Sequence, residues 1–441
     1  MKKIAILVFF TVGFFVHVWA CTGLIAGKQA TVDGSVLVTY SADSHTLYGA
    51  LTSSPAADWP KGSMRSIVEW DTNKPLGEIE QVEHTYAVIG NMNEHQLTVV
   101  ESTWGGRPEL VDTTGIIDYG SLMQLALERA KTAREAIKVM TGLVKKYGYY
   151  SSGESFTIAD PNEAWILDLI GKGPGRRGAV CVAVRIPDDC IAGHANYPRI
   201  HKIPMDDKEN CLYSPDVISF AREMGYFDGL NKDFSFARAY SPADFGALRA
   251  CDARVWSFFR KYDSTMDNYL PYVNGESAEP FPLYVKPSRK LSVQDMKEAM
   301  RDHFEDTPFD MTQDVGAGPF KVPYRFRPMS FEVDGKSYCM ERAIATQQTG
   351  FTLVGQMRNW LPDPVGGVLW FGVDDANTCV YIPMYCGITQ VPECFSPENG
   401  SMYDFSWTSA FWIHNWVANM AYARYEPMIG DIRKVQSAGE T

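Results

Sequence analysis

The start of the chain constrains the fold most strongly, because an apolar leader runs directly into a cysteine. Two lysines precede an apolar run over residues 4–18, and the residues at the −3 and −1 positions suit cleavage after Ala20. This pattern predicts a signal peptide over residues 1–20. Its removal would make Cys21 the first residue of an exported chain.

The segment that follows predicts where the thiol of Cys21 lies. Residues 21–27 and 35–40 have the composition of two strands, and Asp33-Gly34 between them is a turn sequence. A hairpin that begins at residue 21 puts Cys21 at a strand end, beside whatever follows the second strand.

A cysteine at the start of a chain carries two chemical groups that can cooperate. Its free α-amine has a pKa of about 7.7–8.0, and a free thiol has a pKa of about 8.5. One residue, Cys21, would then supply both a nucleophile and the base that activates it. The alternative is a lipoprotein cysteine, acylated on sulfur and nitrogen. Trp19 is bulky where lipoprotein signals favour small residues, but the leader alone leaves both routes open.

Composition narrows the class of protein. The chain has 441 residues, 45% of them hydrophobic, which is enough for one large core. No convincing linker follows the leader, so we expect one catalytic domain over residues 21–441. A net charge of −12 and the absence of basic runs argue against a nucleic-acid partner. The histidines show no metal-ligand spacing, and no later apolar run is long enough to span a membrane. The eight further cysteines are compatible with disulfides or free thiols.

The order of predicted elements favours an α+β design. Hairpins come first, a helix pair follows, and strands return after residue 311, which suggests sheets with helices segregated onto outer faces. Residues 266–288 are rich in Pro and Tyr and are expected to wrap the surface. Strands are expected at 85–89, 97–102, 155–159, 164–169, 324–333, 342–346, 351–356, 368–373 and 379–383. Helices are expected at 119–130, 132–147, 215–224, 251–260, 292–304 and 409–424, the last as a buried core helix.

Several stretches along the chain together resemble the N-terminal-nucleophile cysteine hydrolases. The resemblance is closest to the cysteine dipeptidases of the dipeptidase A type (cysteine-peptidase family sixty-nine), and more distant to choloylglycine hydrolase and penicillin V acylase. It implies a four-layer αββα sandwich, amide-bond hydrolysis and no cofactor. The stretches that carry it are Cys21-Thr-Gly, Asp33-Gly-Ser, Tyr40-Ser-Ala-Asp43, Gly90-Asn-Met-Asn-Glu-His-Gln-Leu97, Glu101-Ser-Thr-Trp-Gly-Gly-Arg107, Gly193-His-Ala-Asn196, Cys251-Asp-Ala-Arg-Val-Trp-Ser257, Val315-Gly-Ala-Gly-Pro-Phe320, Arg342-Ala-Ile-Ala-Thr-Gln-Gln-Thr-Gly350 and Trp360-Leu-Pro-Asp-Pro-Val-Gly-Gly367.

The resemblance assigns roles to four residues. Cys21 matches the nucleophile, and Asp43 matches the acid near its amine. A carboxylate at position 43 could hold an ammonium group, whereas the ordinary alternative is a turn-capping aspartate. Asn196 matches the asparagine that stabilises the oxyanion or orients the amine, and its alternative is a loop residue. Thr103 falls near a second position on the oxyanion side.

Two further positions are less simply matched. The family arginine aligns with Arg249, and Arg254 is the rival. Tyr40 stands where the wider superfamily usually has arginine, so thiolate stabilisation and substrate orientation are expected to differ here.

These observations predict an exported cysteine dipeptidase, acting in the periplasm or outside the cell, with Cys21 as its nucleophile. Two other functions stay open from sequence. One is a related amidase acting on conjugated bile acids or other N-acyl amides. The other is a non-enzymatic lipoprotein, anchored through an acylated Cys21.

Overall fold

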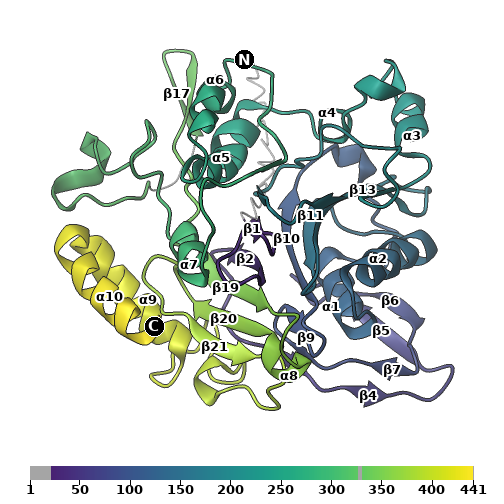
Figure 1. Cartoon of the computed structure of the whole chain (residues 1–441), viewed down its shortest axis with the longest axis horizontal. Coiled ribbons are helices and arrows are strands. Elements are labelled where there is room, and N and C mark those ends of the chain that lie inside the picture. The colour runs from purple at the N-terminus through teal and green to yellow at the C-terminus, as the bar shows by residue number, and fades with distance from the viewer. Residues whose placement is uncertain (1–20, 326–329, 441) are drawn as a thin grey trace, which may run out of the picture.

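The structure is a computed structural model that describes residues 21–325 and 330–440 (Figure 1). The predicted signal peptide lies outside the described residues. Two large antiparallel sheets dominate the fold. The first has the strand order β16-β14-β1-β2-β19-β20-β21, and the second has the order β15-β13-β12-β11-β10-β9-β8-β3. Three two-stranded sheets, β17-β18, β4-β7 and β5-β6, accompany them. This arrangement of helices and antiparallel sheets fits the predicted α+β class.

The strands are β1 (Thr22–Ala26), β2 (Val36–Asp43), β3 (Ser53–Ser54), β4 (Ala57–Asp58), β5 (Met64–Val68), β6 (Pro75–Glu80), β7 (His84–Thr85), β8 (Val88–Ile89), β9 (Met92–Asn93), β10 (Thr98–Trp104), β11 (Gly153–Ala159), β12 (Ala164–Gly171), β13 (Ala179–Ile186), β14 (Ile191–His194), β15 (Cys211–Tyr213), β16 (Tyr284–Val285), β17 (Ser330–Val333), β18 (Lys336–Cys339), β19 (Thr349–Met357), β20 (Val368–Val373) and β21 (Ile382–Tyr385). The α-helices are α1 (Tyr119–Arg129), α2 (Ala133–Tyr147), α3 (Val217–Glu223), α4 (Phe236–Tyr240), α5 (Ala253–Arg260), α6 (Leu270–Val273), α7 (Val293–Met300), α8 (Asp363–Gly366), α9 (Ala410–Ala423) and α10 (Tyr425–Glu440).

The predicted hairpin at the start of the described chain is confirmed. Strands β1 and β2 pair antiparallel, with Gly23 opposite Tyr40. The turn forms because the Asp33 carboxylate accepts from the backbone N–H of Ser35 at 3.0 Å, and Gly34 adopts a φ of +85°. Glycine reaches this left-handed conformation without a steric penalty. The hairpin therefore holds Cys21, the residue before β1, beside the end of β2.

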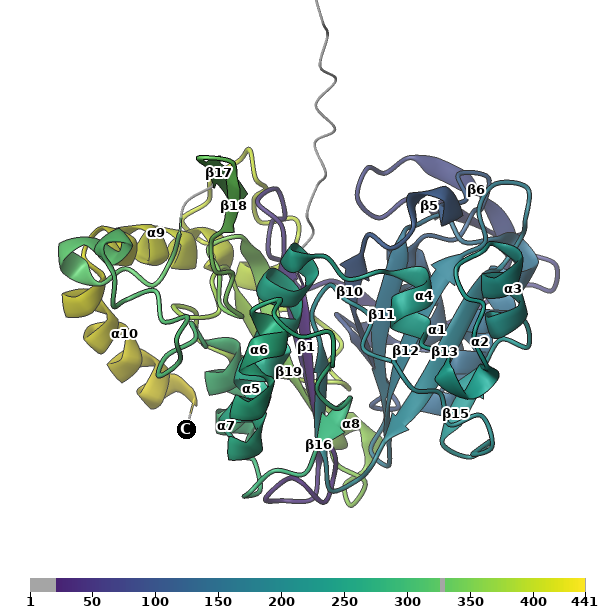
Figure 2. The same ribbon diagram turned by 90° about the horizontal axis from the view of Figure 1, so that it is seen from above.

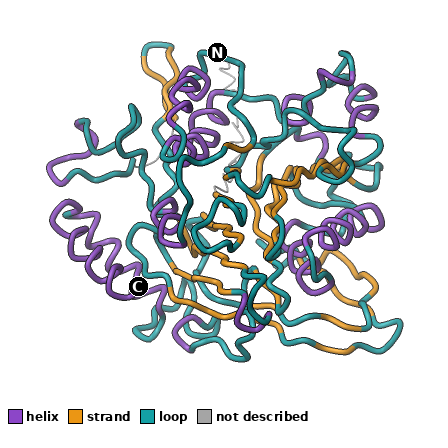
Figure 3. The backbone as a smooth tube through the Cα atoms, in the orientation of Figure 1, coloured by secondary structure: helices purple, strands orange, loops and turns teal. Residues whose placement is uncertain are grey.

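The two large sheets face each other, and helices lie on their outer sides (Figures 2 and 3). One apolar cluster combines side chains of β1 and β2 with side chains of β10, β12 and β13, so it fills the space between the sheets. A second cluster joins the first sheet to α5 and α7, and a third joins the second sheet to α1 and α2. Because strand side chains alternate between faces, each sheet buries both of its faces.

Most local predictions agree with the structure, but some strand predictions are wrong. Strand β10 begins at Thr98, close to the expected 97–102, but the strand expected at 85–89 is divided into the two short strands β7 and β8. Residues 342–346 form a loop rather than a strand. The last predicted strand, 379–383, begins three residues later, as β21. Short strands and loops share the same apolar composition, so long-range pairing decides between them.

The predicted buried core helix over residues 409–424 is also corrected. Helix α9 covers this range, but Trp416 and Met420 are 45% and 50% exposed. Its buried residues form a narrow face of Phe411, Ala418 and Ala421. A second helix, α10, follows directly, and both lie at the edge of the molecule (Figure 1). An aromatic-rich composition therefore indicated burial where only one face is covered.

Candidate active site

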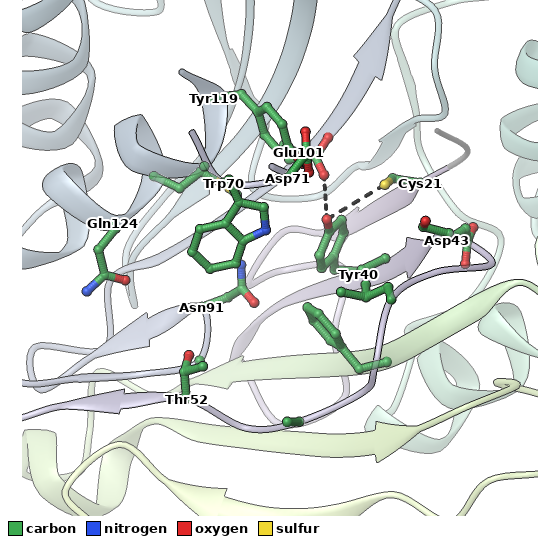
Figure 4. A pocket seen from close by; sticks show the side chains of 18 of the residues that line it. Cys21, Tyr40, Asp43, Thr52, Trp70, Asp71, Asn91, Glu101, Tyr119 and Gln124 are labelled. Carbon is green, nitrogen blue, oxygen red and sulfur yellow. Dashed lines mark hydrogen bonds between the residues drawn. The ribbon is translucent and has the colours of Figure 1, made fainter. Parts of the chain in front are cut away.

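Cys21 lies at the wall of a cavity of about 280 Å³ that opens beside the hairpin. Only 3% of the residue is exposed, and its side chain points toward the hydroxyl of Tyr40 (Figure 4). Apolar side chains, including Leu47, Phe351 and Phe371, form part of the lining. The cavity is smaller than the roughly 300–1,000 Å³ typical of sites for drug-sized ligands, so its volume suits a small substrate.

Tyr40 connects the thiol to a buried carboxylate. The Sγ of Cys21 lies 3.7 Å from the hydroxyl oxygen of Tyr40, and that hydroxyl donates a short hydrogen bond to Glu101 (Figure 4). Burial raises the pKa of the Cys21 thiol well above its ordinary value, and the charges of Glu101 and Asp43 raise it further. The thiol is therefore neutral in this state, and a base is required to activate it.

Asp43 ends β2 and lines the same cavity. One carboxylate oxygen accepts from the hydroxyl of Thr349 at 2.6 Å. The other accepts from Ser41 at 3.1 Å and forms a buried ion pair with Arg342. A carboxylate has about four acceptor positions, so these contacts leave room for one more donor. The structure thus places Asp43 beside the thiol, with its charge already matched by an arginine.

Asn196 follows strand β14 in a left-handed conformation, with a φ of +56° that asparagine tolerates better than most residues. Its side-chain N–H donates to the backbone carbonyl of Thr103 at 2.6 Å, and its side-chain oxygen accepts from Arg254 at 2.7 Å. The same guanidinium donates to the backbone carbonyl of Cys21 at 2.8 Å. Arg254 therefore joins Asn196 to the start of β1, and burial lowers its pKa to about 10.

The structure does not bring Arg249 to this site. Its guanidinium binds Asn274 at 2.7 Å and Glu341 at 3.1 Å. Arg249 lies in a π-helical turn, Ala247–Asp252, and Arg254 lies in the first turn of α5 that follows. Arg249 and Arg254 are five residues apart along a helical path, so their side chains point in different directions around the axis. Of the two, only Arg254 reaches Cys21.

Thr103 lies on β10, opposite Glu154 of β11. Its hydroxyl donates to Glu154 at 3.2 Å. This hydroxyl is therefore already engaged and is not free to act at the cavity. Glu101 lies two residues earlier on β10 and shares the same face, because strand side chains alternate. The sequence patterns alone did not identify Glu101 or Glu154 as residues of the site. The alternation of Glu101 and Thr103 along β10 was the sequence signal that could have indicated that they share a face.

The cavity is acidic. Asp43, Asp71 and Glu101 line it, and its described lining contains no lysine, arginine or histidine. Asp71 accepts from the hydroxyl of Tyr119 at 2.8 Å, and partial burial raises the pKa of Asp71 to about 6. Such a lining attracts a positively charged group. Among the described residues, no cluster of His, Cys, Asp and Glu could hold a metal ion.

His194, which lies two residues before Asn196, is structural. Its ring nitrogens contact Ser102 at 2.6 Å and Thr157 at 2.8 Å. Its pKa is lowered to about 3, mainly by burial and to a smaller extent by the charge of Arg254. The ring is neutral and fully engaged, so it is not a base for Cys21. The cysteines whose side chains are described are all free thiols.

Comparison with known proteins shows which family the chain resembles along most of its length. Residues 20–438 match the model of peptidase family C69. A probable dipeptidase of Latilactobacillus sakei is 24% identical over 92% of this chain and 82% of the relative. A probable dipeptidase of Salmonella dublin is 26% identical over 84% of this chain and 81% of the relative. Dipeptidase A of Lactobacillus helveticus is 24% identical over 92% of this chain and 82% of the relative. Among the described residues, none of the helices combines the length and the apolar character needed to cross a membrane.

Proposed function

The chain belongs to peptidase family C69, and on this basis we propose that it is a dipeptidase whose nucleophile is the thiol of Cys21. The observation that carries the proposal is the position of this thiol, at the end of a hairpin and on the wall of a small acidic cavity. The predicted cleavage after Ala20 frees the α-amine of the same residue. Before cleavage that nitrogen is an amide and cannot accept a proton.

The reaction is an acyl transfer in two stages. The α-amine of Cys21 takes the thiol proton, directly or through a water molecule, and the thiolate attacks the carbonyl carbon of the peptide bond. The protonated amine then donates its proton to the leaving amine. Water then hydrolyses the thioester and releases the N-terminal amino acid of the dipeptide, which was bound to Cys21. The neutral resting thiol supports this scheme, because it needs a base close by.

Asn196 and Arg254 are the proposed oxyanion-side residues. Asn196 uses one side-chain N–H on Thr103 and keeps the second for the developing oxyanion. Arg254 positions Asn196 and the backbone of Cys21 together. Loss of a preorganised donor of this kind costs about 10²–10³ in rate. Thr103 supports Asn196 through its carbonyl, and Arg249 has no part in the reaction.

The proposed substrate is a dipeptide with an unblocked N-terminus, in keeping with the printed names of the relatives. The acidic lining favours a substrate ammonium group, and Asp43 keeps one acceptor position for it. Tyr40 replaces a charged side chain at the cavity wall with a neutral hydroxyl, so substrate carboxylates gain no cationic partner there. The sequence and the cavity together favour small peptides over bulky conjugated amides.

Fold and location complete the proposal. The proposed fold is a four-layer αββα sandwich of the N-terminal-nucleophile type, formed by one domain over residues 21–441, and the two facing sheets with outer helices support it. The leader over residues 1–20 directs export to the periplasm or beyond. A free N-terminal cysteine, rather than an acylated one, is required for the mechanism.

The test combines processing with substrate choice. The mature protein is isolated, its mass and first residue are determined, and hydrolysis of free dipeptides is compared with hydrolysis of their N-acetyl forms and of conjugated bile acids. A free Cys21 with hydrolysis of free dipeptides supports the proposal. Hydrolysis confined to N-acyl compounds favours a different amidase, and an acylated Cys21 without hydrolysis overturns the enzyme mechanism.

A further inference from the structure

Two buried glutamates lie side by side behind the nucleophile. Glu101 on β10 and Glu154 on β11 are diagonal neighbours on one face of the second sheet, since Thr103 pairs with Glu154 and Glu101 pairs with Phe156. Glu101 is 2% exposed, and Glu154 is fully buried. In the part of the chain that the structure describes, neither carboxylate forms an ion pair with lysine or arginine. Two negative charges at this place would repel each other in a poorly screened interior.

The hydrogen bonds of the pair show where a proton is needed. The Oε1 of Glu101 accepts from Tyr40, and the Oε2 of Glu154 accepts from Thr103. The remaining oxygens, Oε2 of Glu101 and Oε1 of Glu154, are buried and accept no hydrogen bond from the described residues. Burial, followed by the charge of Glu101, raises the pKa of Glu154 well above its ordinary value. Two ionised carboxylates only accept hydrogen bonds, so these two oxygens can be satisfied within the pair only if one carboxylate is protonated.

The other charged and titratable groups around the pair do not remove this requirement. The charge of Asp43 is matched by Arg342, and Arg254 directs its guanidinium to carbonyls and to the amide of Asn196. Asp71 adds further negative charge on the cavity side. The remaining neighbours are the phenols Tyr40, Tyr119 and Tyr149, whose pKa values burial raises.

The pair acts on the thiol through one hydroxyl. Tyr40 has a single proton and donates it to Glu101, so toward Cys21 its oxygen can only accept. We propose that Glu101 and Glu154 share one proton, and that the single negative charge left on the pair, relayed by Tyr40, holds Cys21 as a neutral thiol until its amine takes the proton. Glu101 and Glu154 are thus positioning residues. The inference rests on the proposed role of Cys21 as the nucleophile.

This arrangement predicts different effects for two closely related substitutions. Glu154→Gln keeps a neutral donor toward Glu101, so the pair still carries one negative charge and the thiol is unaffected. Glu101→Gln combined with Glu154→Gln removes the charge altogether. The loss of a like charge near the thiol should lower its pKa by about one pH unit. If both carboxylates were ionised in the parent, the Glu154→Gln substitution alone would already produce a downward shift.

The experiment measures the thiol directly and does not depend on hydrolysis. The full unprocessed chain, with its mass verified, is treated with iodoacetamide across the neutral to alkaline range, and alkylation of the Cys21 peptide is followed by mass spectrometry. Cys394 is exposed and serves as an internal reference thiol whose curve should not move. Asp160→Asn is the matched control, because Asp160 is a buried carboxylate that caps α2 just beyond the far end of β11. Circular dichroism confirms that each variant is folded.

The expected result is an unchanged Cys21 curve for Glu154→Gln and Asp160→Asn, and a shift to lower pH for the double variant. An unmoved double variant, or a Glu154→Gln curve that moves as far as the double variant, overturns the inference. If the double variant does not fold, the Glu101→Gln single variant tests the inference instead. In that variant the negative charge lies on Glu154, which is farther from the sulfur. The Cys21 alkylation curve should then move to lower pH by less than in the double variant. No movement in that variant overturns the inference as well.

Failure of this inference can be told apart from failure of the proposed function. Shifted alkylation curves in a protein that hydrolyses no dipeptide would disprove the dipeptidase and leave the shared proton in place. Dipeptide hydrolysis by Cys21 with unmoved curves would do the reverse. In the processed enzyme, the double variant should also move the alkaline limb of the kcat/KM profile, which a merely structural role would not do.

Discussion

Replacing Asp43 by asparagine should reveal how much stability the site holds. The Asp43 and Arg342 side chains form an ion pair at 0% and 7% exposure, respectively. Asp43→Asn removes the negative charge that the buried Arg342 guanidinium pairs with. Breaking a buried pair in this way costs about 3–5 kcal/mol. Since domains are typically stable by about 5–15 kcal/mol, the variant would lose a large share of its stability.

The assay is urea unfolding followed by circular dichroism, with midpoint and slope fitted together. The midpoint of Asp43→Asn should fall while the slope stays constant, which marks a change in stability rather than in compactness. The double variant Asp43→Asn/Arg342→Met removes both charges and should recover part of the loss. Asp431→Asn is the control for the chemical change, because Asp431 pairs with Lys434 on the surface. Its midpoint should equal that of the parent.

A parent-like midpoint for Asp43→Asn would refute this reasoning, because it would mean that the buried pair contributes nothing to folding. Activity must then be compared at a temperature where the variant is fully folded. If Asp43 also binds the substrate amine, selectivity for free over acetylated dipeptides should shrink in the folded fraction. Loss of stability without loss of selectivity would restrict Asp43 to its structural pairing.

Other predictions concern the catalytic residues. Cys21→Ala should abolish hydrolysis while the unfolding midpoint stays near that of the parent; a folded, processed variant with parental activity would disprove the mechanism. The precursor should be inactive until cleavage after Ala20, and a mass-verified uncleaved chain that hydrolyses dipeptides at the mature rate would contradict this. Asn196→Ala should lower kcat by about 10²–10³, with little change in KM. Arg254→Met should lower kcat/KM far more than Arg249→Met, and equal effects would remove Arg254 from the site.

Local sequence patterns predicted the parts of the fold that local chemistry determines. The first hairpin follows from Asp33-Gly34 and two apolar runs, and α2 follows from its helical periodicity and the cap at Thr132, whose side chain accepts from the backbone of Glu135. Each of these signals lies within a few residues of the element it specifies. The position of Cys21 beside the end of β2 was predictable for the same reason.

The rest of the site depends on contacts between distant segments. Arg254 reaches Cys21 from 233 positions away, and Arg342 reaches Asp43 from 299 positions away. No local pattern distinguishes Arg254 from Arg249, because the choice depends on how a π-helical turn rotates into α5. Likewise, the composition of α9 cannot say which face a neighbouring sheet covers.

Tyr40 is the residue that links the departure from the family pattern to the buried acids. An arginine there, as is usual in the wider superfamily, would bring a positive charge beside Glu101 and offset the negative charge of the pair. Tyr40 is neutral, so it offers Glu101 a hydrogen bond but no counter-charge. The interior then accommodates the pair only at a reduced charge, which one shared proton supplies. One shared proton therefore explains both the tyrosine at position 40 and the unpaired oxygens of Glu101 and Glu154. A Tyr40→Arg variant should ionise Glu154 and lower the pKa of Cys21.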